Sequence, residues 1–145
     1  MERVKELYFI VDGPVVVKKR PKFSSKNGVF RTYTPKKTQD YEKKVREAYL
    51  REYPTGMAFE DGPVEMILNV YMAVPKSYSA KKRSHMICFE YPTLHKGDAD
   101  NFLKSVADAL NGVAYTDDCQ IVIATVNKLW SEEDRAEITL RRVSK

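Results

Sequence analysis

A single amphipathic helix with a pair of acids at each end constrains this chain more than any other feature. Phe102, Val106 and Leu110 recur at every fourth position, which is the apolar stripe of a helix that packs on a core. Asn111-Gly112 follows the stripe and ends the helix, because both residues tolerate the left-handed conformation found at helix C-termini. The pattern predicts a helix that ends at residue 110.

Acidic residues stand on both sides of this helix. Asp98 and Asp100 precede it, and Asp117-Asp118 follows it after a short loop. Asp100 or Asn101 can serve as the N-cap, because a short side-chain oxygen accepts a bond from an orphan backbone N–H. If the approach is extended, residues i and i+2 point to the same side, so that both carboxylates face one spot. Converging carboxylates repel each other unless a cation lies between them, and Mg²⁺ prefers such oxygen ligands.

A lysine on the polar side of the helix adds to this pattern. Lys104 lies one turn inside the helix, near the same spot. A third acid from Asp117-Asp118 completes a metal site if the chain reverses after the helix. Taken singly, one Asp before a helix is usually a cap, and two acids in a loop are usually solvated. Their combination is much less common by chance, and it predicts a Mg²⁺ site.

The segments that carry this pattern resemble the signature of the RusA family of Holliday-junction resolvases. These are small, dimeric, Mg²⁺-dependent endonucleases, carried largely by bacteria and their prophages, which act in recombination and repair. The matching segments are Asp98-Ala99-Asp100-Asn101, Lys104, Asp108-Ala109-Leu110-Asn111-Gly112 and Asp117-Asp118-x-Gln120.

The resemblance implies a role for each polar residue of the motif. Asp98, Asp100 and Asp118 would be the metal carboxylates, Lys104 the catalytic lysine and Asp117 a supporting acid. It also implies that the protein is a homodimer, that its partner is branched DNA such as a four-way junction, and that Mg²⁺ is its cofactor, with Mn²⁺ as an alternative. The implied reaction is phosphodiester hydrolysis by a structure-selective endodeoxyribonuclease.

Basic residues cluster away from the motif, in two segments. The formal net charge of +5 supports a polyanionic partner without proving one. The first segment ends in an aromatic ring that is free to stack on an exposed base, and the second lies directly upstream of the acidic motif. Each segment by itself is also compatible with a solvated loop. The candidate DNA-binding residues are Lys18, Lys19, Arg20, Lys22 and Phe23 in the first segment and Lys76, Lys81, Lys82 and Arg83 in the second.

Hydrophobic patterns along the rest of the chain predict the fold. The order is strands, helix, strand, helix and two strands, which predicts an α+β fold: a single RusA-like domain over residues 1–145, with a mixed β-sheet and two main helices on one face. Ser77 or Ser79 can open a further short helix. The expected strands are 7–11 resuming at 15–17, 29–33, 63–74, a mostly buried 120–130 and its antiparallel partner 135–143, and the expected first helix is 39–53 with Thr38 as N-cap.

Composition excludes several classes of protein. A chain of 145 residues with 43% hydrophobic and 31% charged residues suits one packed, soluble domain. Apolar runs are too short for a membrane span or signal peptide. Cys88 and Cys119 form neither a metal pattern nor a disulfide framework, which is typical of a cytoplasmic protein. Two alternatives to the nuclease stay open: a non-catalytic nucleic-acid-binding module, and another metal-dependent phosphohydrolase acting on nucleotides.

Overall fold

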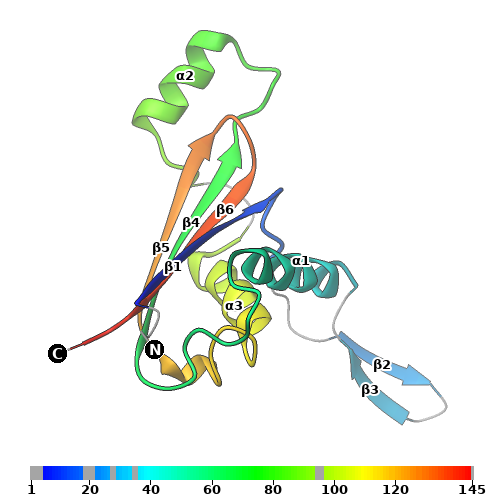
Figure 1. Ribbon diagram of the computed structural model, residues 1–145. Helices are drawn as coiled ribbons and strands as arrows, with labels where there is room; N and C mark the ends of the chain where they lie inside the picture. The colour runs from blue at the N-terminus through cyan, green and yellow to red at the C-terminus, as the bar shows by residue number, and fades with distance from the viewer. Residues whose placement is uncertain (1–4, 18–21, 27–28, 34–35, 94–96, 145) are drawn as a thin grey trace.

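A mixed four-stranded sheet forms the centre of the protein (Figure 1). The computed structural model describes residues 5–17, 22–26, 29–33, 36–93 and 97–144, with the backbone alone within residues 22–33. β5 runs parallel to β4, and the other neighbouring pairs are antiparallel, so the mixed sheet expected from the sequence is confirmed. In the spatial order β1-β6-β4-β5, the strands are β1 (Glu6–Asp12), β6 (Arg135–Arg142), β4 (Val64–Ala73) and β5 (Ile121–Ser131).

The two middle strands bury alternate side chains on one face of the sheet. Val64, Met66 and Leu68 of β4 are fully buried, and so are Ile138 and Leu140 of β6. A strand that has one face on the core and the other in water shows this alternation. The core therefore lies on a single face of the sheet.

Two helices cover this buried face, α1 (Lys36–Glu52) and α3 (Ala99–Leu110), as expected (Figure 1). They also pack against each other. α1 begins at Lys36, so Thr38 is a buried residue within the helix and not its N-cap, which corrects the sequence-based prediction. The buried hydrophobic residues are Tyr41, Val45, Ala48 and Tyr49 of α1 and Phe102, Val106, Ala107, Ala109 and Leu110 of α3.

Two further elements project from this body (Figure 1). α2 (Ala80–Phe89) lies beyond the ends of β4 and β5, and Ser79 caps it by accepting a hydrogen bond from the backbone N–H of Lys82 at 3.2 Å. β2 (Lys22–Lys26) and β3 (Val29–Tyr33) form a separate antiparallel hairpin. Both the short helix and the return strand of the hairpin were expected from the sequence.

The prediction for strand β5 was wrong in two respects. β5 does not pair with β6, because β4 lies between them, and β5 is an edge strand of the sheet. Its side chains are also less buried than expected, with Val122 59% and Ile123 44% exposed. The short connection at 132–134 suggested a hairpin, but it passes the end of β4, where the Val74 N–H donates to the Ser131 carbonyl at 2.9 Å.

Residues 15–17 form no strand, which also differs from the prediction. Gly13 has a φ of +89° and turns the chain out of β1. The segment instead packs over α3, where the Ser105 hydroxyl donates to the Val16 carbonyl at 2.7 Å. Within the described ranges, every helix is too short or too polar to cross a membrane.

Candidate active site

Asp98 and Asp100 lie at the N-terminal end of α3. Asp98 is the N-cap, and its carbonyl accepts the backbone N–H groups of Asn101 and Phe102 at 3.0 and 3.1 Å. The prediction that Asp100 or Asn101 is the N-cap was therefore wrong. The Asp98 side chain makes no capping hydrogen bond. Both aspartates are exposed at the helix end where the macrodipole favours negative charge and where a carboxylate remains available to a ligand.

Gly97 sets the backbone conformation immediately before α3. Its φ of +116° is a conformation that side-chain-bearing residues rarely adopt, and an added Cβ would lie 2.6 Å from both the Phe102 ring and Val17. Asp98 has extended dihedrals, whereas Asp100 is already within the first helical turn. The i, i+2 geometry of a strand therefore does not apply to this pair. Asp100 instead shares a helix face with Lys104, four residues on.

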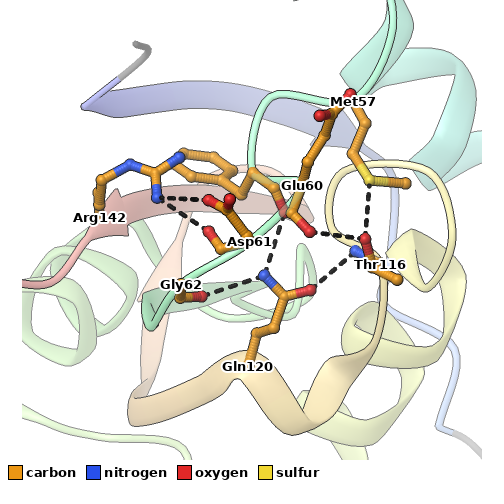
Figure 2. A network of polar contacts seen from close by, with 8 residues as sticks. Met57, Glu60, Asp61, Gly62, Thr116, Gln120 and Arg142 are labelled. Carbon is orange, nitrogen blue, oxygen red and sulfur yellow. Dashed lines mark hydrogen bonds and ion pairs between the residues drawn. The ribbon is translucent and has the colours of Figure 1, made fainter.

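The second acidic pair lies in a tightly bonded turn after α3. The Asp117 carboxylate accepts the Cys119 N–H at 2.9 Å and caps a short 3₁₀ helix, Asp118–Gln120. The Gln120 side chain accepts the N–H groups of Thr116 and Asp117 at 2.8 and 3.1 Å. Figure 2 shows the same amide donating to the carbonyl of Gly62, at 3.0 Å. These bonds fix the turn that presents Asp118.

Asn111 ties this turn back to the end of α3. Gly112 adopts a φ of +76°, so the chain reverses where the Asn-Gly pair predicted it. The Asn111 side-chain oxygen then accepts the Asp118 N–H at 3.1 Å. The turn also rests on the 57–62 segment, because the Thr116 hydroxyl donates to the Glu60 carbonyl at 2.7 Å (Figure 2). The reversal brings Asp118 beside the helix.

Electrostatic effects show which groups surround Asp118. Its pKa is raised, first by burial, then by a hydrogen bond with Asp117 and by the charges of Asp108 and Asp117, while Lys104 lowers it. The pKa of Asp117 is lowered, chiefly by the hydrogen bond from the Cys119 backbone. The Lys104 ammonium lies 3.7 Å from the Asp108 carboxylate. Lys104, Asp108, Asp117 and Asp118 therefore form one charged neighbourhood.

The polar face of α3 connects the two acidic regions. Asp100, Lys104 and Asp108 follow one another at intervals of four residues, so they lie along one face of the helix. That face is distinct from the one that buries Phe102 and Val106. Asp108 had no role assigned from the sequence, although its spacing from Lys104 was a signal that it belongs to the same site.

The donor chemistry of this region fits a divalent cation. Carboxylate oxygens are the ligands that Mg²⁺ and Mn²⁺ prefer, and a cation would relieve the repulsion of Asp118 by the charges of Asp108 and Asp117. The described residues nevertheless contain no group of three or more His, Cys, Asp or Glu side chains arranged to hold a metal ion. The convergence of Asp98, Asp100 and Asp118 on one ion therefore stays a prediction.

The basic segments are described only in part. Lys18, Lys19 and Arg20 lie outside the described residues, and Lys22 and Phe23 lie in β2, of which only the backbone is described. In the second segment, Lys76, Lys81 and Lys82 are exposed, whereas Arg83 is half-buried and pairs with the Glu132 carboxylate at 2.6 Å. The roles predicted for these residues in DNA binding stay predictions.

Residues 15–17, which precede the first basic segment in the sequence, lie against α3. They do so through two contacts, the bond from Ser105 to the Val16 carbonyl and the close approach of Val17 to Gly97. Ser105 is fully buried, and its hydrogen bond to Val16 is partly buried.

Comparisons with known proteins identify the family of this chain. The family model of the endodeoxyribonuclease RusA matches residues 12–141. The chain is also 37% identical over 139 residues to the uncharacterized protein YqaN of Bacillus subtilis (strain 168), a match that covers 94% of this chain and 96% of that protein. The match covers nearly the whole chain and includes both acidic pairs and the helix between them, so the chain belongs to the RusA endodeoxyribonuclease family.

Proposed function

We propose that this protein is a divalent-metal-dependent endodeoxyribonuclease that resolves four-way DNA junctions by paired phosphodiester hydrolysis. Membership of the RusA family supports cleavage of DNA. The observation that carries the proposal is the charged neighbourhood at α3, where Lys104 lies among the carboxylates that surround Asp118. A lysine amid acids suits a reaction that needs a metal ion and a cation at the same phosphate.

Asp98, Asp100 and Asp118 would hold the metal in this proposal. Mg²⁺, or Mn²⁺, polarises a phosphate and lowers the pKa of bound water when it occupies such a site. The N-terminal end of α3 presents Asp98 and Asp100, and the turn after the helix presents Asp118. Asp117 holds this turn through its bond with the Cys119 N–H.

Lys104 acts on the phosphate in the same proposal. Its ammonium group is largely exposed, with 63% of the side chain accessible, so it is free to approach a bound phosphodiester. There it offsets the negative charge that builds on the phosphoryl oxygens. Asp108, 3.7 Å away, holds the ammonium on this side of α3.

A two-fold dimer completes the proposal. A four-way junction has two symmetric strands to cut, and a dimer offers two matched sites. The outer edge of β5 supplies an apolar surface for such an assembly, because Val122 and Ile123 are exposed on it. Light scattering of the purified protein is expected to give twice the mass of one chain.

Cleavage of synthetic DNA tests the proposed function. Purified protein is incubated with a four-way junction, a linear duplex of the same sequence and a mononucleotide, with Mg²⁺ or with EDTA. We expect paired nicks in the junction with Mg²⁺ alone. Junction binding without cleavage by the wild-type protein would favour a non-catalytic module, and turnover of the mononucleotide would favour a nucleotide phosphohydrolase.

The variant Asp100→Asn links this activity to the site. It removes a predicted metal ligand and leaves the basic segments intact, so cleavage is expected to fall at least about 100-fold while junction binding is retained. Asp40→Asn is a matched control, because Asp40 is an exposed aspartate on α1. Normal cleavage by the Asp100 variant would refute the assignment of this ligand.

A further inference from the structure

The segment of residues 75–91, here called the α2 arm, carries exposed aromatic rings that the proposed chemistry does not use. Phe89 is 76% and Tyr91 70% exposed, the highest values among the large hydrophobic residues that the structure describes. Met86 is the only residue of α2 that is buried. The arm extends beyond the ends of β4 and β5, away from α1 and α3 (Figure 1).

These rings border two hollows between the arm and the end of β5. The hollows have volumes of about 280 and 300 Å³, and Tyr91 and Trp130 line both of them. Phe89 and Leu129 line the second. Such volumes are at the lower limit of the range for ligand pockets, which suits a single flat ring better than a large cofactor.

The charge around the rings favours a polyanion. Lys76 and Lys81 are exposed and form no ion pair with a described residue, and the Lys82 ammonium lies 3.7 Å above the Tyr78 ring. Acids also lie nearby, and one of them, Glu90, lines both hollows. Glu90 lies 3.0 Å from the His85 ring, and Glu132 pairs with Arg83. The lysines of the arm are thus available for phosphates beside the rings.

The arm also lies within a limited distance of the acidic motif. Asp98 is the seventh residue after Tyr91, and a fully extended chain of this length spans at most about 25 Å. A base held at Tyr91 would therefore belong to the same small region of DNA as a phosphate held near Asp98. In a four-way junction, the bases of that region are those at the branch point, where stacking is interrupted.

We propose that the α2 arm binds unstacked bases at the branch point of the junction. Phe89 and Tyr91 stack on these bases, while Lys76 and Lys81 contact the adjoining phosphates. Base–aromatic stacking tolerates any sequence because every base has a π-face, so the contact would select branched over fully paired DNA. This inference rests on the proposed function, because it requires that the protein bind junctions.

Equilibrium binding to a junction and to a linear duplex, both in EDTA to prevent cleavage, tests the inference. The double variant Phe89→Ala/Tyr91→Ala is expected to lose at least about ten-fold in junction affinity, and no more than about two-fold in duplex affinity. Phe89→Tyr/Tyr91→Phe keeps both rings and is expected to bind like the wild type. Leu50→Ala is the matched control, because Leu50 is an exposed apolar residue on α1.

Photo-crosslinking locates the contact directly. A junction with 5-iodouracil at the branch point is irradiated with the wild-type protein, and the crosslinked peptide is identified by mass spectrometry. We expect crosslinks at Phe89 or Tyr91. Crosslinks confined to other segments would overturn the inference.

The remaining outcomes separate this inference from the proposed function. If the wild type prefers junctions and the double alanine variant binds them equally well, only the inference fails. An equal loss for junction and duplex, or a change from dimer to monomer on light scattering, also overturns it, because the rings then serve general binding or a protein interface. If the wild type shows no preference for junctions, the proposed function fails and the inference with it.

Discussion

Helices α2 and α3 follow one another in the sequence, yet they differ in how they pack against the core. α3 buries six of its twelve residues, whereas α2 buries one of ten. α3 packs against both the sheet and α1, while α2 extends beyond the sheet end (Figure 1). The helix that carries Lys104 is thus fixed by the core, and the helix that carries exposed rings is fixed by few contacts.

This difference agrees with the roles proposed for the two helices. Groups that act on a reacting phosphate must be held closely in place, and rigid packed elements hold them best. A surface that meets branched DNA benefits from being able to adjust to it, and elements with few buried contacts open and shift most easily. Variants in the two helices can therefore show whether α3 is anchored more firmly than α2.

The largest effect is expected for a core residue of α3. Leu110 is fully buried, so Leu110→Ala should lower the free energy of unfolding by about 2–5 kcal/mol. Phe89→Ala in α2 should change it by no more than about 0.5 kcal/mol, because the ring is exposed. Urea denaturation measures both values. Equal losses would show that the two helices are anchored alike.

Gly97 is expected to give the next largest effect. Gly97→Ala should destabilise the protein by about 1–3 kcal/mol and slow cleavage. The added Cβ would clash with the Phe102 ring, and the φ of +116° is unfavourable for alanine. Gly56→Ala is the matched control, because Gly56 has a φ of +126° but no atom within 4 Å of the added Cβ. If the two variants lose equal stability, the close packing of Gly97 against Phe102 and Val17 does not contribute to the stability of the protein.

The ion pair that holds α2 is expected to contribute less. A double-mutant cycle of Arg83→Ala and Glu132→Ala should give a coupling energy of about 0.2–1 kcal/mol, since the Glu132 side chain is 65% exposed. The coupling should decrease in 1 M salt. A coupling above about 2 kcal/mol would mean that α2 is held as firmly as α3.

Asp118→Asn is expected to have the smallest effect on stability, and in the opposite direction. In the metal-free protein the pKa of Asp118 is raised above 3.8, so the folded state binds this proton more tightly than the unfolded state does. Stability therefore decreases as the pH rises from about 3.8 through the raised pKa. Asparagine does not ionise, so Asp118→Asn does not lose stability in this way. The variant should be more stable than the wild type at pH 7, by less than about 1 kcal/mol.

Thermal unfolding in EDTA at pH 7 measures this effect, with Asp40→Asn as the control for removing an exposed aspartate. A lower melting temperature for Asp118→Asn than for the wild type would contradict the prediction. The same variant should lose cleavage activity. A gain in stability together with a loss of activity is expected where carboxylates are gathered for a ligand.

The elements that a local pattern defines could be predicted from the sequence. The apolar stripe of α3 and the reversal at Asn111-Gly112 were both predicted, because helix period and turn chemistry depend on neighbouring residues. The pairing of β5 could not be predicted, since it depends on β4, which lies nearly fifty residues earlier in the chain. An apolar run such as Ile121–Ile123 looks alike in a central strand and in an exposed edge.

The candidate site was predicted in part for the same reason. The resemblance to RusA resolvases identified Lys104 and Asp118, which the structure places in one neighbourhood. It assigned no role to Asp108, whose contact with Lys104 depends on side-chain conformation. The exposure of Phe89 could not be predicted either, because it depends on how far α2 extends from the sheet.

Anomalous diffraction from Mn²⁺ in crystals with a bound junction would show whether the three aspartates hold one ion. We predict a peak at ligand distance, about 2.1 Å, from carboxylate oxygens of Asp98, Asp100 and Asp118 in each protomer. Lys104 should face the same phosphate. A peak that contacts Asp118 but neither Asp98 nor Asp100 would contradict the claim that these three aspartates hold one ion.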